Sequence, residues 1–115
     1  MNMSNNISDK DIVITSAFRT PIGSYLGSLS DHTAVQLGTE VIKKCIEHSN
    51  LKTNEFDMVY MGQVLQTGSG QNPARQSLIN SGIDNSKTAT TINQVCGSGL
   101  AAVALGLNSL KLNDA

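Results

Sequence analysis

The sequence predicts an α/β fold, a mostly parallel sheet with covering helices, in the order β-α-β-α-β-α. Stretches rich in β-branched residues alternate with stretches whose apolar residues recur at helical spacing. Capping residues, glycines and prolines separate these stretches. Strands and helices that alternate in this way are typical of parallel sheets, and 115 residues suit one small domain. We therefore expect a single α/β unit.

Composition and charge argue against several functional classes. The net charge is −1 and the lysines and arginines form no runs, so no nucleic-acid partner is expected. Two distant cysteines without a secretory signal favour reduced thiols and a cytoplasmic location. Neither His32 nor His48 has a partner at metal-ligand spacing, so no metal site is expected. The longest apolar run, Leu100–Leu107, is shorter than the roughly 20 residues that span a bilayer, so no membrane association is expected.

The chain is expected to begin with a disordered polar tail, residues 1–10, ahead of one domain over residues 11–115. Asp11–Ala17 is apolar and β-branched, which predicts a buried strand covered on both faces. Arg19 follows this strand and could contact a ligand. An arginine at such a position more often anchors loop carbonyls, and we favour that role.

A helix is predicted to open at Thr33, which matches a capping box with Gln36. Apolar residues then recur at three- and four-residue spacing and form a stripe that should face the core, namely Ala34, Leu37, Gly38, Val41, Ile42, Cys45 and Ile46. Cys45 lies in the middle of this stripe, so we interpret it as a core residue and not as a reactive thiol.

The second strand is predicted over Met58–Leu65. After a polar loop, Asn72 is a helix cap and Pro73 is the favoured first helical residue. This helix should reach about Asn80 and stop at Gly82, since glycine commonly follows the last helical turn.

Gly68 and Gly70 lie between this strand and this helix, where a glycine-rich loop could cradle a phosphate. A third glycine, the lysine of a phosphate-binding loop and a suitably placed acidic residue are all missing. A turn is therefore the favoured interpretation of the two glycines.

The third strand, Thr88–Val95, and the third helix, which runs up to Asn113, meet at Cys96. The unpaired N–H groups and the positive dipole end of a helix favour the thiolate, which is the nucleophilic form of cysteine. Gly97, Ser98 and Gly99 would let a substrate come close to the sulfur. The alternative is a buried cysteine that acts as a small apolar residue, and the residues alone support the two about equally.

The third helix is apolar round most of its circumference, and small residues fill the rest. Its large aliphatic residues are Leu100, Val103, Leu105, Leu107, Leu110 and Leu112. A helix of this kind is expected to be buried on all sides. Three strands and two further helices cannot surround it, so either a partner chain covers it or the chain is the front part of a longer protein.

Three stretches carry a family resemblance, in the order Ser16–Gly23, Met61–Gln76 and Asn93–Gly99. They resemble the thiolases, and more narrowly the acetyl-CoA acetyltransferases, the biosynthetic branch of that family. The resemblance runs from about Asp11 to the last residue and implies the front part of the first half of the thiolase fold. Gly97 stands where many members have alanine.

The resemblance implies that Cys96 is the nucleophile that takes up the acyl group as a thioester. The reaction would be the Claisen condensation of two acetyl-CoA molecules to acetoacetyl-CoA and CoA, or the reverse thiolysis. The backbone N–H of Cys96 would be one donor of the oxyanion hole. Coenzyme A thioesters would be substrates, with no permanently bound cofactor, and the full-length family forms homodimers or homotetramers.

Two alternatives stay open beside this function. One is a 3-ketoacyl-CoA thiolase of fatty-acid degradation, and the other is a non-catalytic thiolase-like fragment that acts only by association. The family's activating histidines and second cysteine have no counterpart here, and His32 and His48 do not match them. The isolated chain is therefore expected to be inactive.

Overall fold

The computed structural model describes Ser8 and residues 10–115, so the expected tail lies outside the described residues except for Ser8 and Lys10. The elements follow one another as helix α1 (Ala34–Ser49), a short 3₁₀ helix η1 (Thr53–Glu55), strand β1 (Met58–Gly62), helix α2 (Pro73–Asn80), strand β2 (Thr88–Ile92) and helix α3 (Ser98–Leu112).

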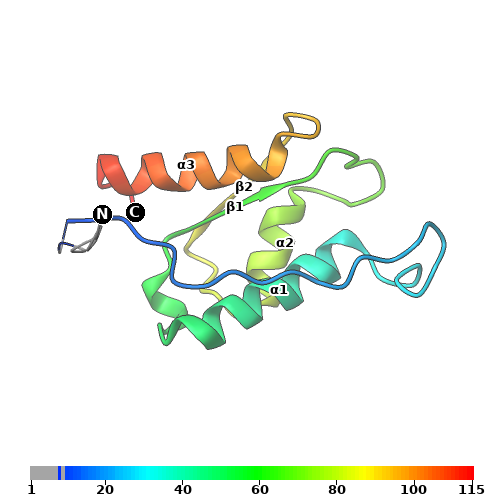
Figure 1. The fold of residues 1–115 in the computed structure, drawn as a ribbon, viewed down its shortest axis with the longest axis horizontal. Coiled ribbons are helices and arrows are strands. Elements are labelled where there is room, and N and C mark those ends of the chain that lie inside the picture. The colour runs from blue at the N-terminus through cyan, green and yellow to red at the C-terminus, as the bar shows by residue number, and fades with distance from the viewer. Residues whose placement is uncertain (1–7, 9) are drawn as a thin grey trace, which may run out of the picture.

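Strands β1 and β2 form a two-stranded parallel sheet in which Met58 lies opposite Thr88 and Gly62 opposite Ile92. Helix α2 connects the two strands, as a parallel pair requires. Figure 1 shows α3 on one side of the strands and α1 and α2 on the other. The predicted α/β fold with a parallel sheet and covering helices is therefore confirmed.

The strand expected over Asp11–Ala17 is wrong: this segment belongs to no strand and is largely exposed. Val13 and Ile14 are 52% and 79% exposed. The segment stays close to the rest of the fold, because the Ser16 hydroxyl donates to the Cys45 carbonyl at 3.2 Å. Strand preference reflects packing on a sheet, and without a backbone ladder to a neighbour the β-branched side chains do not make a strand.

Helix α1 begins as predicted. The Thr33 hydroxyl accepts from the Gln36 N–H at 3.2 Å, and the Gln36 side chain accepts from the Thr33 N–H at 2.8 Å. The helix ends at Asn50, which has a left-handed φ of 59°. Its predicted stripe is mostly buried or half-buried, although Ala34 is exposed.

A small core forms where α2 meets the sheet and α1. Ala74 and Leu78 are fully buried, with Ile83, Ile92 and Val35 beside them at less than a tenth exposed. The buried Ser77 hydroxyl donates to the Val35 carbonyl of α1 at 3.2 Å, so the two helices are joined by a polar contact as well as by packing. This core holds β2 and the chain that follows it in place.

Among the described residues α3 is not buried on all sides, which agrees with the expectation that the other elements of this chain cannot surround it. Its buried residues are Ser98, Ala102 and Ser109, while Leu100 and Leu112 are 78% and 70% exposed. The sheet touches one face of α3, and that face carries the small residues. Small side chains bring the helix close to the strands and leave the large aliphatic ones outside.

By length and composition alone, the stretch that contains α3 is long and apolar enough to cross a membrane. The 18 residues Val95–Leu112 have a mean hydropathy of 1.4, and 11% of them are buried. The window is longer than the run Leu100–Leu107 on which the sequence expectation rested. Core helices of soluble proteins meet the same criterion, so the finding is weak evidence for a membrane.

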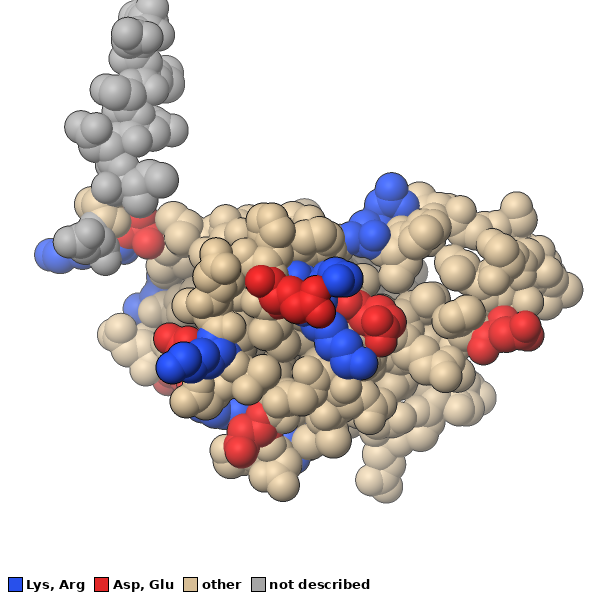
Figure 2. All heavy atoms as spheres, turned by 90° about the horizontal axis from the view of Figure 1, so that it is seen from below, with Lys and Arg blue, Asp and Glu red and all other residues tan. Residues whose placement is uncertain are grey.

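Charges of both signs are mixed on the face seen in Figure 2. Helix α1 carries two ion pairs of its own, Lys43 with Glu40 at 3.2 Å and Lys44 with Glu47 at 2.6 Å. Both pairs are exposed, so each adds little to stability. No single-sign patch of the kind that nucleic acids attract is visible on this face.

Candidate active site

Cys96 lies in a tight turn between β2 and α3, one residue before the Gly97 cap of the helix. Its thiol is free and the residue is exposed. The turn follows the carboxyl end of β2, which is where open parallel sheets place ligands. Cys96 therefore lies at the predicted strand-to-helix position, and in the described chain its thiol is exposed and not buried.

The residue before the cysteine has an uncommon backbone conformation. Val95 has a φ of 51°, in the left-handed region that β-branched residues rarely adopt. Its side chain is 64% exposed, so packing of that side chain does not hold the conformation. Hydrogen bonds on both sides of Val95 accompany this conformation.

Two polar side chains make those hydrogen bonds. Asn93 accepts from the Val95 N–H at 3.0 Å and donates to the Val64 carbonyl of the neighbouring loop at 3.2 Å. The Ser98 hydroxyl accepts from the Gln94 N–H at 2.9 Å and donates to the Val95 carbonyl at 2.7 Å. The turn is thus held on the sheet side by Asn93 and on the helix side by Ser98.

Strand β1 lies directly against the same turn, at the point where α3 begins. A Cβ atom placed on Gly62 would lie 2.7 Å from the Ser98 carbonyl carbon and 2.8 Å from the Gly99 nitrogen. Real Cβ atoms do not come that close, so a glycine is needed for β1 and the start of α3 to meet here. The close contact fixes where α3 begins.

The loop after β1 is held by glutamines. The Gln63 side chain donates to the Ser69 hydroxyl at 2.8 Å, and the Gln76 side chain donates to the Ser69 carbonyl at 2.7 Å. Gly68 and Gly70 have φ values of 80° and 76°, which a turn requires and most side chains disfavour. The geometry agrees with the favoured interpretation of these glycines as turn residues.

Asn72 and Arg75, from the second family-like stretch, have structural contacts. Asn72 caps α2 by accepting from the Arg75 N–H at 3.2 Å and donates to the Ala89 carbonyl of β2 at 2.9 Å. The Arg75 guanidinium donates to the carbonyls of Asn85 and Lys87, which lead into β2. These contacts tie the beginning of α2 to the strand that carries the Cys96 turn.

The other candidate residues, Cys45, His48 and Arg19, are distant from Cys96 in the sequence. Each contacts a different part of the fold. Cys45 is half-buried on α1, as its place in the apolar stripe predicts. His48, at the end of α1, packs edge-on against Phe18 with ring centroids 5.2 Å apart. Arg19 donates to the Thr20 carbonyl at 3.1 Å, which agrees with the anchoring role. Among the described residues no cluster of three His, Cys, Asp or Glu could hold a metal ion.

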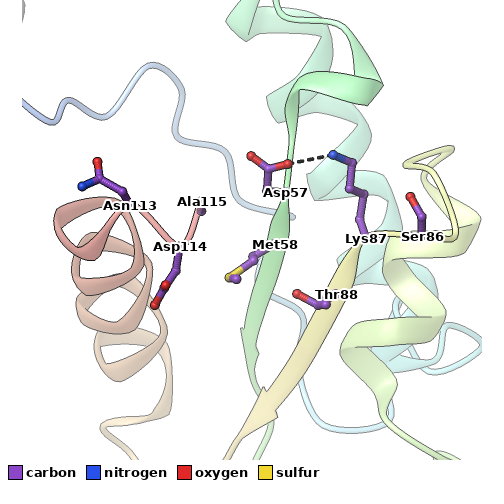
Figure 3. A pocket seen from close by; sticks show the side chains of 8 residues that line it. All are labelled: Asp57, Met58, Ser86, Lys87, Thr88, Asn113, Asp114 and Ala115. Atoms are coloured by element: carbon purple, nitrogen blue, oxygen red, sulfur yellow. Dashed lines mark hydrogen bonds and ion pairs between the residues drawn. The ribbon is translucent and has the colours of Figure 1, made fainter.

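A shallow cavity of about 500 Å³, largely open to solvent, lies at the opposite end of the sheet. Figure 3 shows Met58 and Thr88, the first residues of the two strands, on one side of it and the residues after α3 on the other. The Asp57–Lys87 ion pair, at 2.7 Å, closes its rim. This cavity is not at Cys96, so it does not form part of the candidate site.

The two clear shifts in pKa also lie away from Cys96. The side-chain hydrogen bond and charge of Glu47 raise the pKa of Lys44 on α1. Hydrogen bonds from the Ser86 side chain and backbone lower the pKa of Asp84 in the loop before β2. Both groups are exposed and do not contribute to chemistry at the turn.

The sequence did not reveal the roles of Gly62, Asn93 and Ser98. Ser98 was interpreted only as a small residue beside Cys96, and no role was predicted for Gly62 or Asn93. Some signals were present. A glycine at the end of a strand often marks a close backbone approach. Asparagine and serine beside a strand-to-helix joint often bond to nearby backbone groups.

The fold and the site define an α/β protein that presents an exposed thiol at a strand-to-helix turn. Residues 12–115 match the family model described as "Thiolase, N-terminal domain". The chain belongs to the thiolase family.

Relatives and a solved structure support the same family. The chain is 50% identical to a probable acetyl-CoA acetyltransferase of Escherichia coli over 92% of this chain and 27% of that protein. It is 48% identical to a cytosolic acetyl-CoA acetyltransferase of Gibberella zeae over 88% of this chain and 26% of that protein. The crystal structure of an Ascaris suum thiolase in complex with coenzyme A matches 82% of this chain and 25% of the thiolase chain. The TM-score is 0.81 and the two sequences are 39% identical. The chain spans about a quarter of the length of the curated relatives.

Proposed function

We propose that Cys96 is the acyl-accepting nucleophile of an acetyl-CoA C-acetyltransferase of the thiolase type. The observation that carries the proposal is the exposed thiol of Cys96 in a hydrogen-bonded turn at the start of α3. The relatives named acetyl-CoA acetyltransferase support this activity over other thiolase activities. The substrates would be coenzyme A thioesters, which enter and leave in each cycle, and no cofactor would stay bound.

In the first half-reaction the Cys96 thiolate attacks the carbonyl carbon of acetyl-CoA. A new carbon–sulfur bond forms to Cys96, the bond to the coenzyme A sulfur breaks, and coenzyme A leaves with the electron pair and takes up a proton. In the second half-reaction the deprotonated methyl carbon of another acetyl-CoA attacks the acetyl-Cys96 carbonyl. Acetoacetyl-CoA forms and the Cys96 thiolate is released.

The backbone around Cys96 suits the oxyanion that forms in both steps. Gly97 and Ser98 donate the backbone hydrogen bonds of the turn, Ala101 donates the first one of α3, and the Cys96 N–H donates none of these. A developing oxyanion on the acyl group could therefore accept from the Cys96 N–H, where the positive end of the α3 dipole adds to the stabilisation. Removal of the substrate α-proton requires a base. We expect that base from parts of a longer protein, as in the family resemblance.

The proposal extends to setting and assembly. We propose a cytoplasmic protein, supported by the relative whose name calls it cytosolic. We also propose that it works as a homo-oligomer, since the large aliphatic residues of α3 are exposed in the single chain. A 3-ketoacyl-CoA thiolase with longer acyl substrates and a non-catalytic partner of a full-length thiolase are the competing functions.

The test is incubation with acetyl-CoA followed by peptide mass mapping. We expect an acetyl group on Cys96 that is lost in Cys96→Ser, because a serine hydroxyl is far harder to deprotonate than a thiol. Cys45→Ser is the matched control and should leave the acetylation intact. Acetylation of Cys45 with unmodified Cys96 would contradict the proposal. Turnover of acetoacetyl-CoA with coenzyme A, measured with the rest of the protein present, separates the enzyme from the non-catalytic alternative.

A further inference from the structure

The turn that carries Cys96 is held in an unfavourable conformation, and Ser98 contacts both sides of the strained residue. We propose that Ser98 is a positioning residue for Cys96, which keeps Val95 in its left-handed conformation and thereby sets the direction of the thiol. The inference rests on the proposed role of Cys96 as the acyl-accepting nucleophile. Ser98 itself touches no reacting atom in this account.

The hydrogen bonds of Ser98 span Val95. Its hydroxyl accepts from the N–H of Gln94, the residue before Val95, at 2.9 Å. The same hydroxyl donates to the Val95 carbonyl at 2.7 Å, and the Ser98 N–H donates to that carbonyl at 3.1 Å. One side chain therefore satisfies the backbone groups on either side of the residue whose φ is 51°.

Ser98 is itself firmly located. It is 4% exposed and begins α3, and its backbone lies against Gly62 of β1 so closely that a Cβ atom there would overlap it. A hydroxyl held by a helix and a strand can hold the turn in its place. Val95 has no comparable support from its own side chain, which is 64% exposed.

Loss of the Ser98 hydroxyl would leave the Gln94 N–H without its acceptor and would release Val95 toward a relaxed conformation. Cys96 directly follows Val95, so its thiol would change direction relative to a bound thioester. A displacement of about 1 Å at a reacting group can lower a rate about 100-fold. Ser98 is assigned no contact with acetyl-CoA, so we expect the effect to fall on the rate of acyl transfer and not on binding.

The experiment measures single-turnover acetylation of Cys96 by mass spectrometry over a range of acetyl-CoA concentrations, with the rest of the protein present. Ser98→Ala should lower the maximal rate constant about 10- to 100-fold and leave the half-saturating concentration unchanged. Ser109→Ala is the matched control, because Ser109 is a second buried serine of α3 and bonds to Tyr60 at 2.8 Å. It should acetylate at the wild-type rate.

A second variant separates positioning from folding. Asparagine adopts the left-handed region much more readily than valine, so Val95→Asn should restore most of the lost rate in the Ser98→Ala background. A wild-type rate in Ser98→Ala overturns the inference. The inference is also overturned if the double variant is as slow, or as unfolded, as Ser98→Ala. The hydroxyl would then stabilise the fold without positioning Cys96.

The proposed function can fail separately. If Cys96 is not acetylated when the rest of the protein is present, that function is overturned, and alkylation of Cys96 by iodoacetamide then tests the inference alone. We expect the single variant Ser98→Ala to change the alkylation rate of Cys96. The double variant Ser98→Ala with Val95→Asn should return that rate toward the wild-type value. Identical alkylation rates in all three chains overturn the inference.

Discussion

Gly62, the last residue of β1, lies so close to Ser98, the first residue of α3, that a Cβ atom on Gly62 would approach the Ser98 carbonyl carbon to 2.7 Å. The contact joins two elements that the sequence separates by 36 positions (98 − 62). It sets the height of α3 above the sheet and with it the place of the turn that carries Cys96.

Gly62→Ala should destabilise the chain by about 1–3 kcal/mol, because its methyl group would meet backbone atoms that cannot move aside. The acetylation rate of Cys96 should fall as well, since α3 must shift. Urea unfolding and the acetylation assay measure the two effects.

Gly38→Ala is the control for this prediction. Its methyl group would also overlap a neighbour, at 2.5 Å, but that neighbour is the terminal methyl of Met61, the flexible end of a side chain, and the next atom, the Ser77 hydroxyl oxygen, lies at 3.1 Å. Alanine also favours the interior of α1 over glycine by about 1 kcal/mol, which offsets the repacking. We expect a stability within about 1 kcal/mol of the wild type. Equal losses in both variants would show that the contact with Ser98 has no special weight.

The outer face of α3 should drive association of the 115-residue chain. Leu100 and Val103 are 78% and 56% exposed, and burial of each such side chain is worth roughly 1.5–3 kcal/mol. The double variant Leu100→Lys with Val103→Lys should reduce the sedimentation-derived mass at micromolar concentration, because two added charges oppose burial of this face.

The matched control places the same two charges elsewhere. Ile22 and Leu65 are 84% and 86% exposed and lie in loops. Ile22→Lys with Leu65→Lys should leave the mass closer to the wild-type value. A wild-type chain that is a stable monomer at micromolar concentration would refute the prediction outright.

Asn72→Ala should destabilise the chain by about 1–2 kcal/mol, in the range of a lost helix cap. The side chain caps α2, accepts from the Thr91 hydroxyl at 2.8 Å and donates to the Ala89 carbonyl, and the backbone has a left-handed φ of 43°. Asn72→Asp keeps the acceptor for the cap and loses only the donor to β2, so it should cost less. Thermal unfolding in the same buffer compares the three chains, and an equal loss in both variants would contradict the capping argument.

The lowered pKa of Asp84 predicts how the stability of the fold depends on pH. Hydrogen bonds from Ser86 hold the pKa of its carboxyl below the ordinary value of 3.8. A carboxyl whose pKa is lowered by folding stabilises the fold above the unfolded value, and this contribution is lost as the pH falls through the folded value. Ser86→Ala should raise the pKa of Asp84 toward 3.8, which an NMR titration of that carboxyl measures. An unchanged titration would assign the shift to the backbone N–H alone.

Sequence reasoning located the joints of the fold well where a local signal marks them. The capping box at Thr33 and the asparagine–proline pair at Asn72 both open helices where expected. These signals depend on hydrogen bonds within one turn of the chain, which neighbours in sequence supply. Cys96 could likewise be placed before a helix from the change in composition around it.

The same reasoning failed where the outcome depends on distant partners. Asp11–Ala17 has a strand-like composition, yet a strand forms only when another strand offers a ladder. In α3, periodicity could show that apolar residues surround the axis but not which of them touch the sheet. The contacts with Gly62 and Tyr60 decided that the small residues face inward.

The sequence by itself determined the alternation of helices and strands from Thr33 onward, the starts of α1 and α2 and the place of Cys96 at a strand-to-helix joint, because each depends on groups a few residues apart. Only the tertiary structure decided the conformation of Val95 and the roles of Ser98, Asn93 and Gly62 around it. Those features need β1, β2 and α3 to meet in space. Their energies come from backbone contacts between segments that no local pattern connects.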